Sequence, residues 1–324
     1  MSALSIRTKT IIAILTLYVV WGTTYLAIKV GLDADLPPAL FAGLRCVPAG
    51  LALLGIARWR GASIAITRPD LRIVAIVGVL LLCGGQYGTF VAEQSIASGL
   101  AALIVALLPL WIALAESALP DMQRPSLLGW IGLTIGFVGL GILLFPKLLG
   151  VSAGVGALLG IGTQILATWL WSGGSIYSKR HPVGVDPLVS TGYQMLIAGV
   201  VLVALGTALG EWSEFHMTPK GFAAIAYLIV FGSCVAFTAF TYALAHAPAS
   251  KVMTYAYVNP VIAVFVGWLA GSAGLIPAEP VTASMLLAMT VIVAGVAIAV
   301  AAPTRPARGA HGLEGEVEPV PSEV

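Results

Sequence analysis

The stretch WGTTYLAIKVG at residues 21–31 has a counterpart 150 positions later, WSGGSIYSKRH at residues 171–181. Each stretch begins with a tryptophan and carries a lysine eight residues further on, Lys29 in the first and Lys179 in the second. Because the chain has 324 residues, a spacing of 150 relates its first half to its second. The recurrence suggests an internal repeat, which the surrounding sequence tests.

Composition indicates a membrane protein. Only 9% of the residues are charged, whereas a soluble globular domain carries roughly a quarter, and the mean hydropathy is +1.00. The net charge of +2 is too small to suggest a nucleic-acid partner. The three cysteines, Cys46, Cys83 and Cys234, lie in apolar runs without CxxC spacing, which argues against a disulfide framework or a zinc site.

Ten apolar segments are long enough to cross a hydrocarbon core of roughly 30 Å, which takes about 20 helical residues. We therefore expect an all-α membrane protein with ten transmembrane helices. Short joins rich in Pro, Gly and charge leave no room for a soluble domain, and the first run is too long for a signal peptide. The segments lie near residues 10–30, 38–57, 71–92, 97–118, 127–145, 153–177, 187–209, 220–244, 252–272 and 281–302.

The basic residues predict the orientation. With a cytoplasmic amino terminus, twelve of the 16 Lys and Arg residues lie inside, three lie near the other face, and Arg45 lies within a span. An even number of spans returns the carboxy terminus to the cytoplasm. Residues 303–324, rich in Pro, Gly and Glu, are expected to form a disordered cytoplasmic tail.

The two halves of the chain share more than Trp and Lys. If five helices repeat, the second copy crosses the membrane in the opposite sense, because five is odd. We expect two inverted five-helix repeats around a central cavity, residues 1–150 and 151–302, an arrangement that supports alternating access. The matched pairs are Pro38 and Pro187, Gly43 and Gly192, Gly50 and Gly199, Pro109 and Pro260, and Gly139 and Gly295.

The runs WGTTYLAIKVGL, LPPALFAGLRCVPAGLALL, FVAEQSIASGLAALIVALLPLWIAL and GWIGLTIGFVGLGILL resemble the first half of an EamA-type ten-helix carrier of the drug/metabolite transporter superfamily. YALAHAPASKVMTYAYVNPVIAVF resembles the matching second half. The resemblance, over residues 10–302, implies a cavity between two inverted halves and transport of small metabolites. Aromatic amino-acid exporters of bacterial inner membranes belong to this group. The resemblance therefore implies that this protein also lies in a bacterial inner membrane.

Uncharged polar and aromatic residues inside the spans are the candidate substrate contacts. Their polar groups would be costly in hydrocarbon unless they faced another helix or a wet cavity. Ordinary hydrogen bonding between helices is the alternative for each of them, and Trp also gathers at membrane interfaces. The predicted substrate-binding residues are Gln86, Tyr87, Gln164, Tyr242, Tyr255, Tyr257, Asn259, Trp21 and Trp111.

Prolines and charges refine this prediction. Pro109 and Pro260 remove backbone hydrogen bonds within two spans and are candidate hinges, although prolines also kink static bundles. Arg45 either extends to the outer headgroups or holds a partner, such as a freed carbonyl or a substrate carboxylate. Glu93 and Glu116, near span ends, are expected to be solvated.

The function we expect is a secondary transporter that exports small amphipathic metabolites, most plausibly aromatic amino acids, by alternating access. Carriers of other metabolites or drugs remain the alternative within the superfamily. A membrane enzyme is disfavoured, because the sequence shows neither a clustered acid, base and nucleophile nor a nucleotide loop. Substrate and lipid are the expected partners; no metal, cofactor or nucleic acid is expected, and nothing indicates the oligomeric state.

Overall fold

The structure, a computed structural model, describes residues 5–96, 101, 104–148, 154–272 and 282–306, and these ranges are mostly helical. The helices of the first half are α1 (Ile6–Leu32), α2 (Pro38–Trp59), α3 (Arg68–Gly78), η1 (Val79–Gln86), α4 (Tyr87–Glu93), α6 (Leu108–Ala118) and α7 (Leu127–Leu148). Those of the second half are α8 (Val155–Arg180), α9 (Pro187–Ala208), η2 (Glu211–Ser213), α10 (Pro219–Tyr227), η3 (Leu228–Val235), α11 (Ala236–His246), α12 (Ala249–Val252), α13 (Tyr255–Ser272) and α14 (Ala283–Ala301).

Helix occurs in each of the ten predicted segments. Within the described residues, eight helices are long and apolar enough to cross a membrane, and Leu108–Ala118 and Leu127–Leu143 are shorter apolar helices. The ten-span topology therefore stays a prediction, while the chain is a predominantly helical membrane protein. Of the predicted tail, residues 307–324 lie outside the described residues.

Helix starts follow local chemistry. The Thr67 hydroxyl accepts a hydrogen bond from the Asp70 N–H at the start of α3, and the Thr218 hydroxyl accepts one from the Gly221 N–H at the start of α10. In both helices a proline occupies the first turn, where its missing N–H costs nothing. The two N-caps are 151 positions apart and serve helices that occupy matching places in the two halves.

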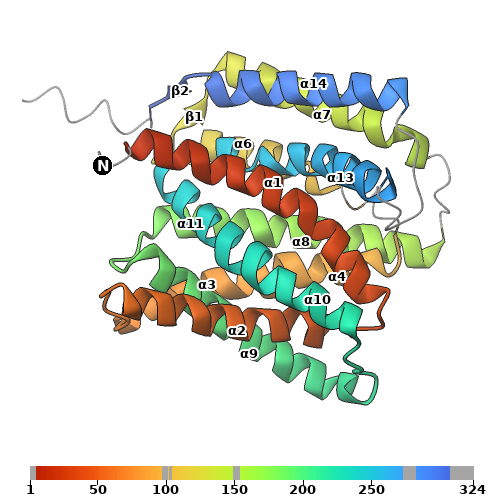
Figure 1. Cartoon of the computed structure of the whole chain (residues 1–324). Coiled ribbons are helices and arrows are strands. Elements are labelled where there is room, and N and C mark those ends of the chain that lie inside the picture. The colour runs from red at the N-terminus through yellow and green to blue at the C-terminus, as the bar shows by residue number, and fades with distance from the viewer. Residues whose placement is uncertain (1–4, 97–100, 102–103, 149–153, 273–281, 307–324) are drawn as a thin grey trace, which may run out of the picture.

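Helices α2 and α9 pack against each other along one edge of the molecule (Figure 1). A Cβ atom built on Gly50 would lie 2.7 Å from the carbonyl oxygen of Gly192, and one built on Gly43 would lie 3.1 Å from that of Gly199. Because the lower number of one helix meets the higher number of the other, the two helices run antiparallel. The glycines thus permit close backbone approach, as in membrane helix pairs generally.

Helices α7 and α14 form the corresponding pair at the opposite edge (Figure 1). A Cβ atom on Gly295 would lie 2.9 Å from the carbonyl oxygen of Gly132, and one on Gly139 would lie 2.9 Å from the backbone nitrogen of Ile292. This pair is also antiparallel. A two-stranded ribbon, β1 (Arg124–Pro125) with β2 (Thr304–Arg305), joins the ends of these helices.

Two π-helices interrupt the third and eighth predicted spans. Residues 79–86 form η1 and residues 228–235 form η3, so both have eight residues and their starts are 149 positions apart. A π-helix is rare, and it is usually a single turn at a functional site. Apolar periodicity does not predict such a change of helix type, so the matching pair is a finding of the structure.

Candidate functional site

A cavity of about 650 Å³, measured with its mouth, lies between helices of both halves. It is bordered by the carboxy-terminal half of α1, by η1 and α4, by the start of α6, by α8 and by the first turns of α13. Its aromatic lining consists of Trp21, Phe90, Trp171 and Tyr255. Its polar lining consists of Thr24, Gln86, Thr89, Gln164, Thr168 and Asn259, and the remaining lining residues are apolar.

Three of the aromatic lining residues belong to a cluster of five rings on one side of the cavity. The Trp21 ring meets the rings of Trp171 and Tyr255 edge to face, with centroids 5.7 and 4.7 Å apart. Phe237 and Phe240 of α11 complete the cluster, and all five side chains are buried in one apolar core. Edge-to-face contacts at these distances are favourable, so the cluster forms a rigid apolar floor.

Gly85 lets η1 pack closely against Trp171 of α8. A Cβ atom at Gly85 would lie 2.8 Å from Cε3 of Trp171, which leaves no space for a side chain. The backbone of η1 therefore lies directly against the Trp171 ring. This contact between the first and second halves forms one wall of the cavity.

Arg45 does not extend to the membrane surface. Its side chain is 2% exposed, and its Nη2 donates a hydrogen bond to Oε1 of Gln86. The alternative in which Arg45 holds a partner is therefore the correct one, and the partner is an amide that lines the cavity. Burial of a charged guanidinium is costly unless it is hydrogen-bonded, which makes the Gln86 contact structurally important.

A second amide of the cavity comes from α8. Nε2 of Gln164 in α8 donates to Oγ1 of Thr89 at 3.2 Å, and the Thr89 hydroxyl donates to the Gly85 carbonyl at 3.0 Å. Gln164 is completely buried. Three buried polar atoms of cavity residues have no hydrogen-bond partner among the described residues: Oε1 of Gln164, Oδ1 of Asn259 and Nε1 of Trp171.

Five of the predicted contacts line the cavity, namely Trp21, Gln86, Gln164, Tyr255 and Asn259. The structure places the other four outside its lining. Tyr87 is absent from the lining and packs against the buried cluster that contains Phe41 and Phe90, and Tyr242 stacks on His246 with centroids 4.2 Å apart. Tyr257 is fully buried against Gly136 of α7, and Trp111 meets Trp169 edge to face at 6.1 Å.

The repeat also points to one lining residue outside the predicted set. Trp171 is the repeat partner of Trp21, and the two rings meet in the cavity floor. Phe90, Thr24, Thr89 and Thr168 carried no distinguishing signal, because threonine and phenylalanine are common in buried helices of any kind.

The prolines lie beside helix breaks rather than at them. Pro109 occupies the first turn of α6, just after a turn at residues 106–107, and so removes no mid-helix bond. Pro260 lies inside α13, whereas the break in that span is the turn at residues 253–254 between α12 and α13. Pro109 therefore follows a break within its predicted span, and the role of both prolines as hinges stays a prediction.

The turn between α11 and α12 is held from two sides at the end of the molecule remote from the cavity. Nζ of Lys179 donates to the carbonyl oxygens of Leu244 and Ala247, at 3.0 and 2.5 Å. Glu116 accepts hydrogen bonds from the N–H groups of Ala249, at 2.6 Å, and Ser250, at 3.3 Å. Glu116 is fully buried, so the expectation of a solvated carboxylate is wrong.

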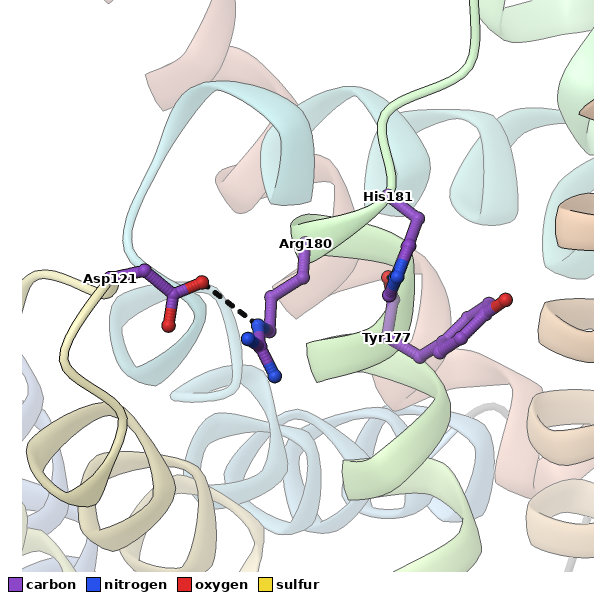
Figure 2. A network of polar contacts seen from close by, with 4 residues as sticks. All are labelled: Asp121, Tyr177, Arg180 and His181. Atoms are coloured by element: carbon purple, nitrogen blue, oxygen red, sulfur yellow. Dashed lines mark hydrogen bonds and ion pairs between the residues drawn. The ribbon is translucent and has the colours of Figure 1, made fainter.

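An exposed contact network lies at the same end of α8 (Figure 2). Nε of Arg180 donates to Oδ2 of Asp121 at 2.9 Å, and the His181 ring stacks on Tyr177. Arg180 and Asp121 are 41% and 49% exposed, so their ion pair contributes little to stability. Within the described part of the chain, no group of three or more His, Cys, Asp or Glu side chains could hold a metal ion.

Long apolar helices around a cavity with aromatic and neutral polar walls define a polytopic membrane transporter. The model of the EamA-like transporter family matches residues 8–145 and again 158–301, and this chain belongs to that family. The chain is 36% identical over 256 residues to the "Uncharacterized inner membrane transporter YedA" of Escherichia coli (strain K12), covering 79% of this chain and 80% of the relative.

Other similar proteins agree with this assignment. The "Uncharacterized transporter YvbV" of Bacillus subtilis (strain 168) is 25% identical over 300 residues, which cover 90% of this chain and 92% of the relative. A solved crystal structure, described only as that of a protein, matches with a TM-score of 0.75 at 22% identity, over 90% of this chain and 96% of that one. The latter similarity supports the fold alone.

Proposed function

We propose that this transporter exports small amphipathic metabolites, with aromatic amino acids as the first candidates. One observation carries the proposal: a cavity of about 650 Å³, measured with its mouth, is lined by the rings of Trp21, Trp171 and Tyr255 together with the amides of Gln86 and Gln164. Aromatic walls suit the apolar part of a solute, and a few placed polar groups suit its head.

We also propose that the two halves are inverted repeats that alternate in opening to the two sides of the membrane. Support comes from the two matches of one family model, from the π-helices 149 positions apart and from the antiparallel glycine pairs of α2 with α9. In such a mechanism the aromatic floor below the cavity is the closed side, and the turn held by Lys179 and Glu116 belongs to the same closed end.

Transport in proteoliposomes tests the proposal. Vesicles preloaded with unlabelled phenylalanine should accumulate labelled phenylalanine by counterflow, and tryptophan and tyrosine should compete better than alanine or leucine. An imposed gradient of phenylalanine should drive the exchange without a proton gradient. Counterflow of aliphatic amino acids, or of unrelated cationic drugs, with no response to aromatic ones would reject aromatic substrates and favour another solute of this family.

Two tryptophan variants connect that experiment to the cavity. Trp171→Leu removes a ring from the floor, whereas Trp169→Leu removes a ring that is 55% exposed and absent from the lining. Aromatic contacts contribute about 0.5–1.5 kcal/mol beyond buried area, so Trp171→Leu should weaken phenylalanine by roughly tenfold. Trp169→Leu should leave it nearly unchanged. If the two variants had equal effects on phenylalanine, this cavity would not be the substrate-binding site.

A further inference from the structure

The hydrogen bonds around the cavity determine which atoms its amides can offer to a solute. Arg45 has only donors, so Gln86 must turn Oε1 toward Arg45. The amide N–H groups of Gln86 are then the part of its head group left for the cavity that it lines. Because Arg45 is almost fully buried, solvent cannot replace Gln86 as its partner, and rotation of the Gln86 amide would leave a charged group unpaired.

The orientation of the second amide follows from a chain of two bonds. A threonine hydroxyl has one hydrogen, and that of Thr89 is donated to the Gly85 carbonyl. Thr89 can therefore only accept from Gln164, which must direct its NH₂ group at Thr89. The buried Oε1 of Gln164 remains as an acceptor without a partner among the described residues, and Oδ1 of Asn259 is in the same condition.

We propose that the cavity is polarised and selects zwitterionic amino acids over amines or acids with the same side chain. The Gln86 N–H groups receive the carboxylate, with the Trp171 indole N–H as a second donor. Oε1 of Gln164 and Oδ1 of Asn259 receive the ammonium group. This inference rests on the proposed function as a carrier of amphipathic solutes and specifies the head group that such a solute carries.

The residues that position the two amides, Gln86 itself and Thr89, are near neighbours on one helical segment. Thr89, which holds Gln164, follows Gln86 by three residues, and helical side chains at that spacing are about 5–6 Å apart at Cβ. The carboxylate and ammonium groups of an α-amino acid are attached to the same carbon atom, so both can be received at once. Arg45 acts as a positioning residue, because without it the Gln86 amide could rotate and present its oxygen to the carboxylate.

Binding of two sets of probes to the purified full-length protein tests the inference. The aromatic set is phenylalanine, phenethylamine and 3-phenylpropionate, and the aliphatic set is leucine, 3-methylbutylamine and 4-methylpentanoate. Each set keeps the side chain and removes one charged group at a time. In at least one set, calorimetry should show the zwitterion binding about tenfold or more tightly than either analogue, since each lost pole removes a charge-assisted hydrogen bond.

Variants test which residues receive the carboxylate and which receive the ammonium group. Gln164→Leu should weaken phenylalanine and phenethylamine about tenfold and leave 3-phenylpropionate within about twofold. Arg45→Met should reduce the preference for phenylalanine over phenethylamine, a ratio that a merely structural role would not change. If Arg45→Met does not fold, the double variant Arg45→Met with Gln86→Leu removes both the buried charge and the Gln86 donors, and it should reduce the same preference. Gln194→Leu is the matched control, because Gln194 is equally buried but lies outside the cavity.

The outcomes separate this inference from the proposed function. A preference for the leucine zwitterion without binding of the aromatic set would support the polarised cavity and reject aromatic substrates. Absence of a zwitterion preference in both sets, including failure of every probe to bind, would overturn the inference. So would equal losses for all three aromatic probes in the Gln164→Leu and Gln194→Leu variants.

Discussion

Gly50 of α2 lies so close to Gly192 of α9 that a Cβ atom on Gly50 would be 2.7 Å from the Gly192 carbonyl oxygen. The obstacle is backbone, which cannot rotate away as a side chain would. Gly50→Ala should therefore separate the two helices and lower stability by about 1–3 kcal/mol, the usual cost of overpacking. Thermal unfolding of the purified protein in detergent measures the loss.

Gly55→Ala in the same helix is the matched control. A Cβ atom at Gly55 meets nothing within 4 Å, so this substitution should leave stability unchanged or raise it by about 0.5–1 kcal/mol through helix propensity. If Gly50→Ala is as stable as Gly55→Ala, the backbones of α2 and α9 do not approach each other closely at Gly50.

Two tyrosines, the partly buried Tyr18 and the fully buried Tyr257, differ in what their hydroxyl groups contact. Tyr18 donates to Oγ1 of Thr254 at 2.7 Å, because the Thr254 hydroxyl hydrogen is already donated to the Lys251 carbonyl. The Tyr257 hydroxyl is buried without a partner in the part of the chain that the structure describes. Tyr18→Phe should lose about 0.5–1.5 kcal/mol, whereas Tyr257→Phe should gain about 1 kcal/mol.

Thermal unfolding of both variants beside the wild type checks this pair. Tyr257→Phe should also transport the same solutes with unchanged selectivity, because Tyr257 packs against α7 and not against the cavity. A large loss of stability in Tyr257→Phe would show that a residue or water satisfies its hydroxyl.

Most helix ends were predictable because they depend on local chemistry. Pro38 and Pro187 begin α2 and α9 at the predicted residues, where a fixed φ suits the first turn of a helix. The breaks inside spans were not predictable. The turn at residues 253–254 and the π-helix η1 lie within apolar runs whose hydrophobicity is continuous, so their sequence carries no boundary signal.

Membership in the cavity was predictable only in part, because helices that are apolar all round give no sign of which face points inward. Tyr255 and Tyr257 are two residues apart, which places them on nearly opposite faces of a helix with 3.6 residues per turn. Tyr255 consequently lines the cavity while Tyr257 packs on α7. Adjacent Gln86 and Tyr87 diverge in the same way.

The structure also predicts which loops share a face of the membrane. Glu211, just after α9, accepts hydrogen bonds from the N–H groups of Ala39 and Leu40 at the start of α2. At the other end of this helix pair, the Tyr193 hydroxyl donates to the carbonyl of Ile64, beyond the end of α2. The start of α2 and the end of α9 therefore lie on one side.

Single cysteines test this arrangement and the predicted orientation together. Asp33→Cys and Ser213→Cys should react with an impermeant thiol reagent from outside sealed cells, whereas Ser63→Cys and Gly184→Cys should react only after the membrane is opened. The background protein lacks the native cysteines and must retain wild-type abundance. Labelling of Asp33→Cys, just before α2, and Gly184→Cys, just before α9, from the same side would contradict the inverted second half, and exchange of the two sides would reverse the orientation.

Glu116 and Glu211 make the same kind of contact at a helix start but differ in their exposure to solvent. Each carboxylate accepts two backbone N–H groups at a helix start, but Glu116 is fully buried and Glu211 is partly exposed. Glutamine keeps one acceptor oxygen and sets an NH₂ group against the second N–H. At Glu211 water can replace the lost bond, so Glu211→Gln should cost less than about 1 kcal/mol.

Glu116 is fully buried, so solvent cannot replace the lost hydrogen bond. Glu116→Gln should therefore lower the free energy of unfolding by about 1.5–3 kcal/mol, the range for hydrogen bonds to a charged group. It should also loosen the turn that Lys179 holds from the other side. Thermal unfolding measures the first effect, and faster amide hydrogen exchange at Ala249 and Ser250 measures the second. A Glu116→Gln variant as stable as the wild type would mean that Glu116 is protonated, because glutamine imitates a neutral carboxyl group at no cost.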